Sequence, residues 1–267
     1  MVVQHNLSAM NTNRQMGVVT SALQKSTEKL SSGYKINRAG DDAAGLSISE
    51  KMRSQIRGLN KASDNAQDGI SLIQVAEGAL NETHSILQRM NELATQAAND
   101  TNTSVDRQSI KDEIEQLNEE LDRISTTTQF NKQDLLTGGF SGKLQVGALE
   151  GQTMDVKISL AVSANGLRVS AVEVSTNAKA GIAMQSIQDA IESVSKQRSK
   201  LGAIQNRLEH TINNLDTNAE NTQAAESRIR DTDMADEMVQ YSKNNILSQA
   251  GQSMLCLLYT SPSPRDA

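Results

Sequence analysis

Hydrophobic side chains recur at alternating steps of four and three residues along three stretches of the chain. Such steps place side chains on one face of an α-helix. The three stretches begin at Met52, Ile110 and Ile187. They predict three long amphipathic helices that pack as an antiparallel bundle through coiled-coil-like seams. The seam residues on which we base this prediction are Ile56, Leu59, Ile73, Leu80, Leu117, Leu201, Leu208 and Leu215.

The first predicted helix has recognisable ends. Asp41 and Asp42 suit its start, because a carboxylate there accepts hydrogen bonds from free N–H groups and meets the positive end of the helix dipole. We expect the polar stretch 99–104 to end it. Both prolines of the chain, Pro262 and Pro264, lie near its end. Residues 1–261 therefore lack the residue that most strongly interrupts helices, and very long helices are permitted.

Between the second and third helices the period of the pattern changes to two. Leu144 and Val146 alternate with polar or small residues, and Met154, Val156 and Ile158 do the same. Alternation of this kind predicts β-strands. We expect a small β-hairpin region over residues 142–172, with turns at 150–151 and 165–166, that caps the bundle. The predicted fold class is mainly α, a long antiparallel helical bundle with a small β-hairpin region.

The two ends of the chain carry weaker apolar stripes, over residues 3–23 and 234–247. Such segments bury too little surface by themselves to offset the entropy lost on ordering. We expect both to be mobile in the monomer and to be ordered by partners. Residues 256–267 contain the single cysteine and both prolines, a break in composition that is typical of a cloning or read-through tail.

Composition and charge exclude several classes of protein. Aromatic residues make up 2% of the chain, so the core is built from small aliphatic side chains. The net charge is −6, and no cluster of basic residues is interleaved with aromatics, which argues against nucleic-acid binding. No apolar run is long enough for a membrane span or a cleaved signal peptide.

Charge is distributed unevenly between the two ends. Residues 1–38 carry five basic side chains and one acidic side chain, whereas residues 205–240 carry eight acidic and three basic ones. Two interpretations remain open at this point. The two regions are either solvated helix faces, or they pair with each other or with neighbouring copies.

Candidate catalytic and metal-binding residues are few. His5, His84 and His210 lie on different segments without a metal-ligand spacing, and Cys256 has no second cysteine. No zinc-protease, phosphate-loop or serine-hydrolase motif occurs. His84 falls on the first seam, which favours a hydrogen-bonded structural role. We therefore expect no enzymatic activity, no cofactor and no metal.

Several longer motifs at both ends resemble those of the bacterial flagellins. In the first part of the chain these are NLSA at 6–9, LSSGYKIN at 30–37 and AGDDAAGL at 39–46. In the last part they are RSKLGA at 198–203, QNRL at 205–208, AESRIRD at 225–231 and NIL at 245–247. The resemblance covers residues 3–255. Beyond Leu255 the family's Ala/Gln/Asn-rich helix with a Leu-rich tip is not recognisable.

The resemblance implies a domain organisation and a set of partners. Residues 1–41 and 231–255 correspond to terminal helices that line the inner tube of the flagellar filament. Residues 42–176 and 177–230 correspond to the rod domain, without the variable outer domains of many relatives, and 256–267 to the tail. The implied partners are other flagellin subunits, the flagellar export apparatus and its chaperone, and the filament cap and hook-junction proteins. The implied location is the extracellular flagellum, where the filament serves motility, and no cofactor is implied.

The resemblance also suggests a receptor-binding segment. LQRMNELA at 87–94 is similar to the stretch of the family that Toll-like receptor 5 recognises. Arg89, Glu92 and Leu93 map onto it, with Glu113 on the neighbouring helix. The alternative is that this segment is a solvated helix face. A non-filament secreted adhesin or interaction protein, or a flagellin-associated enzyme, are the alternative functions for the whole chain.

Overall fold

The computed structural model describes residues 7–260. The start of the N-terminal stripe, His5 and the last seven residues of the expected tail lie outside these described residues. The chain is mainly α-helical with a small β region, as predicted. Its elements are α1 (Leu7–Ser32), α2 (Ala43–Ala97), α3 (Ser104–Thr127), β1 (Gln129–Phe130), β2 (Gln133–Asp134), β3 (Phe140–Gln145), β4 (Thr153–Ile158), α4 (Asn177–Arg230) and α5 (Met234–Thr260).

The described residues divide into two compact units. Of the described residues, one unit comprises 7–56 and 220–260, and the other comprises 57–219. The expected domain boundaries at 41/42 and 230/231 both fall inside the first of these units, next to the outer ends of α2 and α4. Helix α5 continues past Leu255 into the segment that we expected to be an unrelated tail.

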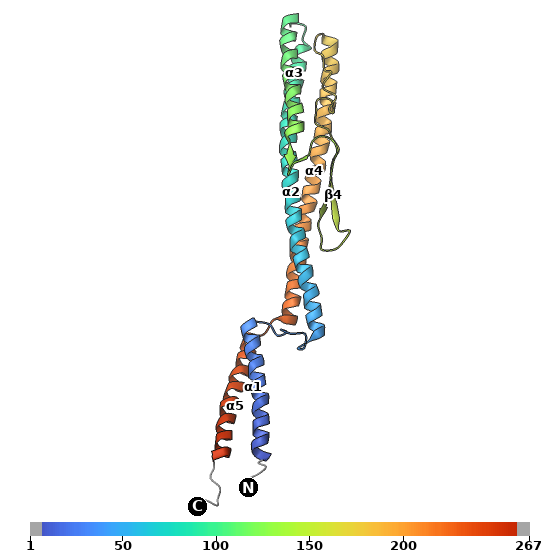
Figure 1. Cartoon of the computed structure of the whole chain (residues 1–267). Helices are drawn as coiled ribbons and strands as arrows, with labels where there is room; N and C mark the ends of the chain where they lie inside the picture. The colour runs from blue at the N-terminus through green and yellow to red at the C-terminus, as the bar shows by residue number, and fades with distance from the viewer. Residues whose placement is uncertain (1–6, 261–267) are drawn as a thin grey trace, which may run out of the picture. The chain divides into compact units, whose positions relative to one another are not determined.

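In the unit of residues 57–219, α2 and α4 run side by side in opposite directions, and α3 lies along α2 (Figure 1). The side-chain contacts between α2 and α4 follow this order. They join Ser63 to Asp216 (2.9 Å), Glu77 to Arg198 (3.6 Å), and the carbonyl of Ala98, just after α2, to Asn177. From contact to contact, the residue number increases along α2 and decreases along α4, so the two helices are antiparallel.

The core of this unit is formed mainly by aliphatic residues of α2, α3, α4 and the β region. Four of the seam residues, Ile73, Leu80, Leu201 and Leu208, are completely buried in it. Leu59 and Leu215 are buried in a smaller cluster with Ala62 and Ala219. Ile56 and Leu117 are half-buried. The predicted seams thus lie in the interior of the chain itself.

Helix α2 is buried on a wider face than the seam counted from the sequence. Ala76, Thr83, Met90 and Ala97 recur every seven residues and are completely buried, although none lies on that seam. The reason is that α3 and α4 both cover α2, so a second row of side chains is removed from water. Met90 and Ala97 belong to the main core for this reason.

Side-chain and backbone caps fix the starts of α2 and α3. The Asp42 carboxylate accepts a hydrogen bond from the N–H of Gly45 at 2.9 Å, as expected, whereas the Asp41 carboxylate accepts from the N–H groups of Asn37 and Arg38 in the preceding linker. Thr103 caps α3 through a reciprocal arrangement with Asp106, in which each side chain accepts a bond from the other residue's backbone N–H. The hydroxyl and the N–H of Thr103 both donate to the Asp106 carboxylate, and they lower the pKa of this carboxyl.

The β region contains two antiparallel hairpins. Strands β3 and β4 pair with Leu144 opposite Met154, within the range predicted from the alternating pattern. On β4, Met154, Val156 and Ile158 are buried and the intervening residues are exposed. The β1–β2 hairpin was not predicted. Its turn residues Asn131 and Lys132 have φ of 47° and 62°. Glycine is the residue usually found at the second of these positions, so a lysine there does not indicate a turn in the sequence.

The β3–β4 hairpin lies along the helices and does not cap the bundle as we expected. The Asn65 side chain of α2 donates to the carbonyl of Gln145 at 3.2 Å, and Gln197 of α4 donates to the carbonyl of Lys157 at 3.3 Å. Close approach depends on a glycine, because a β-carbon at Gly58 would lie 2.8 Å from that of Ala148. These contacts hold the hairpin against the sides of α2 and α4.

In the other unit, α1 packs against α5 (Figure 1). Lys29 of α1 and Glu237 of α5 form an ion pair at 3.3 Å, so at least this pair of oppositely charged residues from the two ends does meet. The linkers beside these helices are joined by a β-bridge between Tyr34 and Asp231. Arg230, at the end of α4, stacks over the Tyr34 ring at 4.6 Å and forms an ion pair with Glu50 at 2.9 Å.

Candidate functional site

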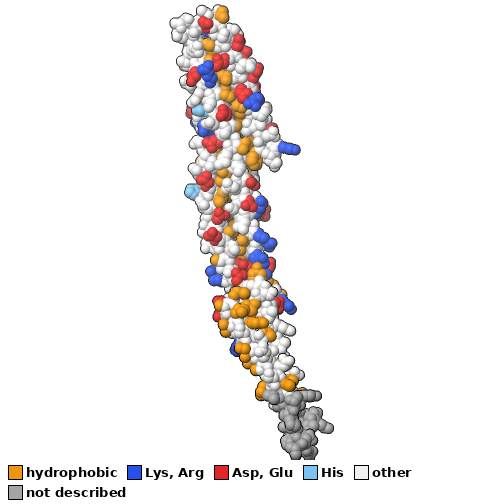
Figure 2. Space-filling model, turned by 90° about the vertical axis from the view of Figure 1, so that its left-hand side faces the viewer, with side chains coloured by type: hydrophobic (Ala, Val, Ile, Leu, Met, Phe, Trp, Pro, Cys, Tyr) orange, Lys and Arg blue, Asp and Glu red, His pale blue; other side chains and the backbone are white. Residues whose placement is uncertain are grey.

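The α1–α5 pair exposes an unusual amount of apolar surface. Figure 2 shows apolar side chains gathered over this pair, whereas acidic and basic side chains are interspersed along the longer helices. Among the residues of α1 and α5 whose side chains the structure describes, nine large hydrophobic ones are exposed. They are Leu7, Met10, Val18, Met234, Met238, Val239, Ile246, Leu247 and Met254, and we call them the terminal apolar set.

The two helices bury little of their surface against each other. Among the described residues of α1, Ser26 alone is fully buried, and no described residue of α5 is. Leu7 and Val18 lie about three turns apart on the same side of α1, and Leu7 is 76% exposed. A helix with apolar residues on faces that its neighbour leaves uncovered normally finds a further partner.

The residues assigned to receptor binding meet at the contact between α2 and α3. Arg89 of α2 donates through Nε to Glu113 of α3 at 2.9 Å, and through Nη1 to Glu92 at 3.2 Å. The hydrogen bond to Glu113 is the main cause that raises the pKa of the Arg89 guanidinium. The side chains of Arg89 and Glu113 are 52% and 44% exposed. This arrangement forms a charged surface that spans two helices.

Leu93 occupies a different position from these three residues. Its side chain is 2% exposed and belongs to the main core. It lies four residues after Arg89, but α2 is covered on more than one side, so this position faces inward. Arg89, Glu92 and Glu113 are therefore the assigned residues whose side chains reach the surface.

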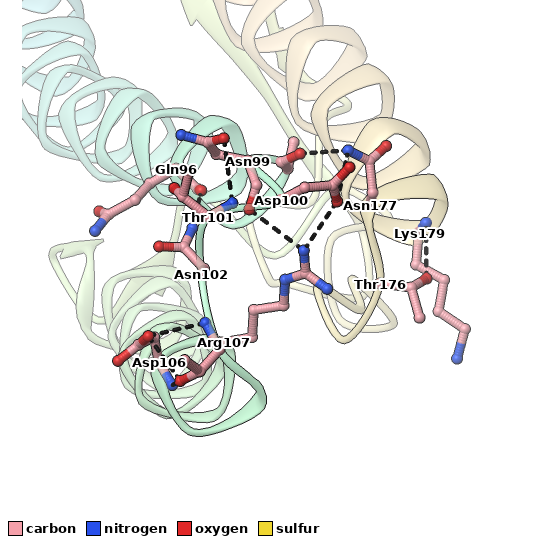
Figure 3. A network of polar contacts seen from close by, with 12 residues as sticks. Gln96, Asn99, Asp100, Thr101, Asn102, Asp106, Arg107, Thr176, Asn177 and Lys179 are labelled. Carbon is pink, nitrogen blue, oxygen red and sulfur yellow. Dashed lines mark hydrogen bonds and ion pairs between the residues drawn. The ribbon is translucent and has the colours of Figure 1, made fainter.

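A polar network at one end of this unit holds the α2–α3 turn against the start of α4. Figure 3 shows Arg107 of α3 and Asn177 of α4 pointing toward Asp100 in the turn. Arg107 donates through Nη2 to the Asp100 carboxylate and to the carbonyl of Asn99, both at 3.3 Å. Asn177 also donates to the carbonyl of Ala98. These contacts fix the position of α3 beside α2, on which the pairing of Arg89 with Glu113 depends.

The candidate metal-binding residues do not come together in the part of the chain that the structure describes. No group of three or more histidine, cysteine, aspartate or glutamate side chains among the described residues is placed to hold a metal ion. His84 is half-buried and its Nε2 lies 3.0 Å from the Gln88 amide nitrogen, in keeping with a structural role. His210 lines an open depression of about 440 Å³ that has no acidic side chain in its walls. No helix of the described part is long and apolar enough to cross a membrane.

Family comparisons cover both ends of the chain. Residues 3–141 match the bacterial flagellin N-terminal helical region, and residues 184–262 match the bacterial flagellin C-terminal helical region. The second match continues beyond Leu255, where we expected the resemblance to end. The match therefore includes all of α5.

Individual relatives agree with the family comparison. A flagellin of Halalkalibacterium halodurans is 55% identical over 257 residues, which cover 96% of this chain and 94% of the relative. A flagellin of Bacillus subtilis is 51% identical and covers 96% of this chain and 95% of its own length. The crystal structure of Bacillus cereus flagellin is 33% identical, with a TM-score of 0.52 over 61% of this chain and 94% of that one. Identity of this extent over nearly the whole length, together with the matches at both ends, shows that the chain belongs to the bacterial flagellin family.

Proposed function

We infer that this chain is a structural subunit that polymerises with copies of itself into a bacterial flagellar filament. The observation that carries the inference is the terminal apolar set, which α1 and α5 leave exposed although both are well-formed helices. Membership of a structural family supports the same conclusion. A relative from Treponema maltophilum, 50% identical over 96% of this chain, is named a flagellar filament core protein.

A second copy of the chain is the partner that best fits this surface. Apolar side chains that are 45–76% exposed in one chain lose contact with water only when neighbouring copies cover them. Burial contributes about 25 cal/mol per Å² of apolar surface. Because every subunit presents the same set, the gain is repeated at each addition to a polymer whose contacts join different parts of the set. We propose that the terminal apolar set forms the principal contact between subunits.

The assembly proposal is tested by placing a charge in the terminal apolar set. Ile246→Lys alters a side chain that is 67% exposed on α5, so the helical content of the monomer is expected to stay the same. The concentration needed for polymerisation is expected to rise at least about tenfold, because a charged group resists burial. Electron microscopy and sedimentation measure filament formation, and circular dichroism measures helicity.

Ile182→Lys is the matched control, since Ile182 is 70% exposed on α4 and lies outside the terminal apolar set. It is expected to polymerise at a much lower concentration than Ile246→Lys. Filaments that form from the two variants at one concentration would contradict the assignment of the surface. A chain that stays monomeric under all polymerising conditions would instead favour a non-filament secreted interaction protein.

We also propose that the chain is a ligand of Toll-like receptor 5, through a surface formed by Arg89, Glu92 and Glu113. What supports this is the fixed position of the Arg89 guanidinium, which two carboxylates orient while its side chain stays half exposed. An oriented arginine at a surface is a frequent contributor to binding energy in protein interfaces. Leu93, which is buried, acts in this proposal by holding α2 in place.

Receptor recognition is tested with Arg89→Ala and a matched arginine variant. Binding to the purified receptor ectodomain is expected to weaken at least about tenfold. Arg123→Ala is the control, because Arg123 is exposed on α3 and pairs with Glu120 in a similar i, i+3 arrangement. Equal affinities of the two variants would refute the assignment of the surface.

We further propose that the flagellar export apparatus and its chaperone deliver the chain to the extracellular filament, where it meets the cap and hook-junction proteins. Family membership supports this proposal. Detection of the chain in filaments sheared from cells, and its loss from them when export is blocked, is the expected result. Accumulation outside cells with export blocked would contradict it.

A further inference from the structure

The exposed methionines among the described residues all lie in one of the two units. The described residues include nine methionines. The four that are exposed all lie on α1 and α5, namely Met10 (64%), Met234 (49%), Met238 (50%) and Met254 (56%). The remaining five are half-buried or buried. The exposed methionines thus make up almost half of the terminal apolar set.

The other methionines are less accessible for identifiable reasons. Met90 and Met154 are 0% and 8% exposed within the core of residues 57–219. Met16 of α1 is half-buried on the side that faces α5, where its sulfur would lie 3.9 Å from a β-carbon at Gly251. Met52 and Met184 are also half-buried. The buried and half-buried methionines therefore serve as an internal reference, against which the reactivity of the exposed thioethers can be compared.

Exposed thioethers react with two-electron oxidants such as hydrogen peroxide. The sulfur lone pair attacks one peroxide oxygen, the O–O bond breaks, and an S–O bond forms. The sulfur loses two electrons, and the peroxide is reduced to water. The product, methionine sulfoxide, is polar and chiral, and its oxygen is a strong hydrogen-bond acceptor.

The consequence of oxidation depends on whether the side chain is later buried. In the monomer a sulfoxide at these four positions stays hydrated, so folding is little affected. In a polymer that covers the terminal apolar set, the same oxygen is removed from water and is costly without a donor. Oxidation therefore opposes assembly without opposing folding.

We propose that Met10, Met234, Met238 and Met254 are oxidation sites through which peroxide-type oxidants reversibly weaken self-association of this chain. The proposal rests on the assignment of the terminal apolar set as the assembly surface. It adds that methionines of this surface can be oxidised and that their oxidation weakens assembly. Oxidants are expected to act on free subunits, because subunits already in a filament have these side chains covered.

The first measurement is a map of sulfoxide formation by peptide mass spectrometry. The folded monomer is treated briefly with hydrogen peroxide. The four exposed methionines are expected to react at least about tenfold faster than Met90 and Met154, because access to the sulfur controls the rate. In preformed filaments the four are expected to be protected. Similar rates at exposed and buried methionines in the monomer would overturn the proposal.

The second measurement compares polymerisation before and after peroxide treatment. The concentration needed for filaments is expected to rise at least about tenfold on oxidation, while the circular dichroism of the monomer stays the same. Methionine sulfoxide reductases with a thiol reductant are expected to restore the original value, because sulfoxide formation is reversible. An unchanged concentration in a sample with all four sites oxidised would overturn the proposal.

Variants assign the effect to these side chains. In a chain with M10L, M234L, M238L and M254L, the ratio of treated to untreated concentrations is expected to be close to one, because leucine is apolar and does not react. The matched control carries M52L and M184L, at the half-buried positions, and is expected to keep the full effect of peroxide. Each ratio refers to that variant's own untreated sample. Equal ratios in the two variants would refute the assignment.

Failure of this inference is distinguishable from failure of the assembly proposal. If untreated chain forms no filaments, the assembly proposal fails and this inference, which rests on it, fails too. If untreated chain forms filaments and oxidation of the four sites has no effect on them, the inference alone fails. The assembly surface is then tested independently by Ile246→Lys.

Discussion

Truncation of Leu208 tests whether the α2–α4 seam holds the unit of residues 57–219 together. Leu208 is 0% exposed and lies in the main core. Leu208→Ala removes the buried methyl groups and leaves a cavity between two long helices that cannot easily close. Substitutions of this kind cost about 2–5 kcal/mol. Since 1 kcal/mol shifts the melting temperature of a domain this size by about 2–4 °C, the expected decrease is about 4–20 °C.

The assay is urea unfolding followed by circular dichroism, with thermal melting as a second measurement. Leu149→Ala is the control in the same unit, because Leu149 is 68% exposed in the β3–β4 loop. Its effect is expected to stay within about 0.5 kcal/mol. If Leu208→Ala and Leu149→Ala unfold at the same urea concentration, the seam does not carry the stability of this unit.

Three further predictions concern local features of the two units. Gly58→Ala is expected to be at least about 1 kcal/mol less stable than Gly78→Ala in urea unfolding, because its new β-carbon meets Ala148 at 2.8 Å while Gly78 has open space around it. The helix cap made by Asp106 is expected to be complete above the ordinary carboxyl pKa of 3.8 and to be lost as the pH falls through its lowered pKa. Amide chemical shifts of Asp106→Asn should show a flatter acid-side pH dependence at the start of α3, and an unchanged profile would contradict this. Arg230→Ala is expected to cost about 1–2 kcal/mol, since it removes an aromatic contact and an ion pair whose partner, Glu50, is 54% exposed, and faster hydrogen exchange in the two linkers measures the loss.

The spacing of hydrophobic residues and the positions of proline in the sequence determine most of the secondary structure. Seam residues such as Leu80 and Leu201 define helical faces without any knowledge of their partners. The absence of proline over residues 1–261 lets these helices run for 55 and 54 residues. Alternation at Met154, Val156 and Ile158 is enough to predict β4. These signals are local, because each depends on spacing along one segment of chain.

The sequence was less informative about features without a local signal. The β1–β2 hairpin was missed because its turn uses Lys132 at a positive φ, which no turn rule anticipates. Met90 and Leu93 lie off the counted seam, so their burial depends on how many neighbours α2 acquires. The candidate receptor residues were identified by resemblance, and periodicity alone did not separate Leu93 from its exposed neighbours Arg89 and Glu92.

What the sequence by itself determined is therefore which segments are helices, which face of each is apolar, and which family the motifs resemble. The tertiary structure decided which of these apolar faces are buried against other segments of the same chain. It covers α2 on more than one side, lays the β3–β4 hairpin along the helices at Gly58, and brings Arg89 to Glu113. On α1 and α5 it leaves the terminal apolar set uncovered. The physical reason is that the spacing of apolar residues indicates which side chains avoid water, whereas the packing of segments distant in sequence determines what covers them.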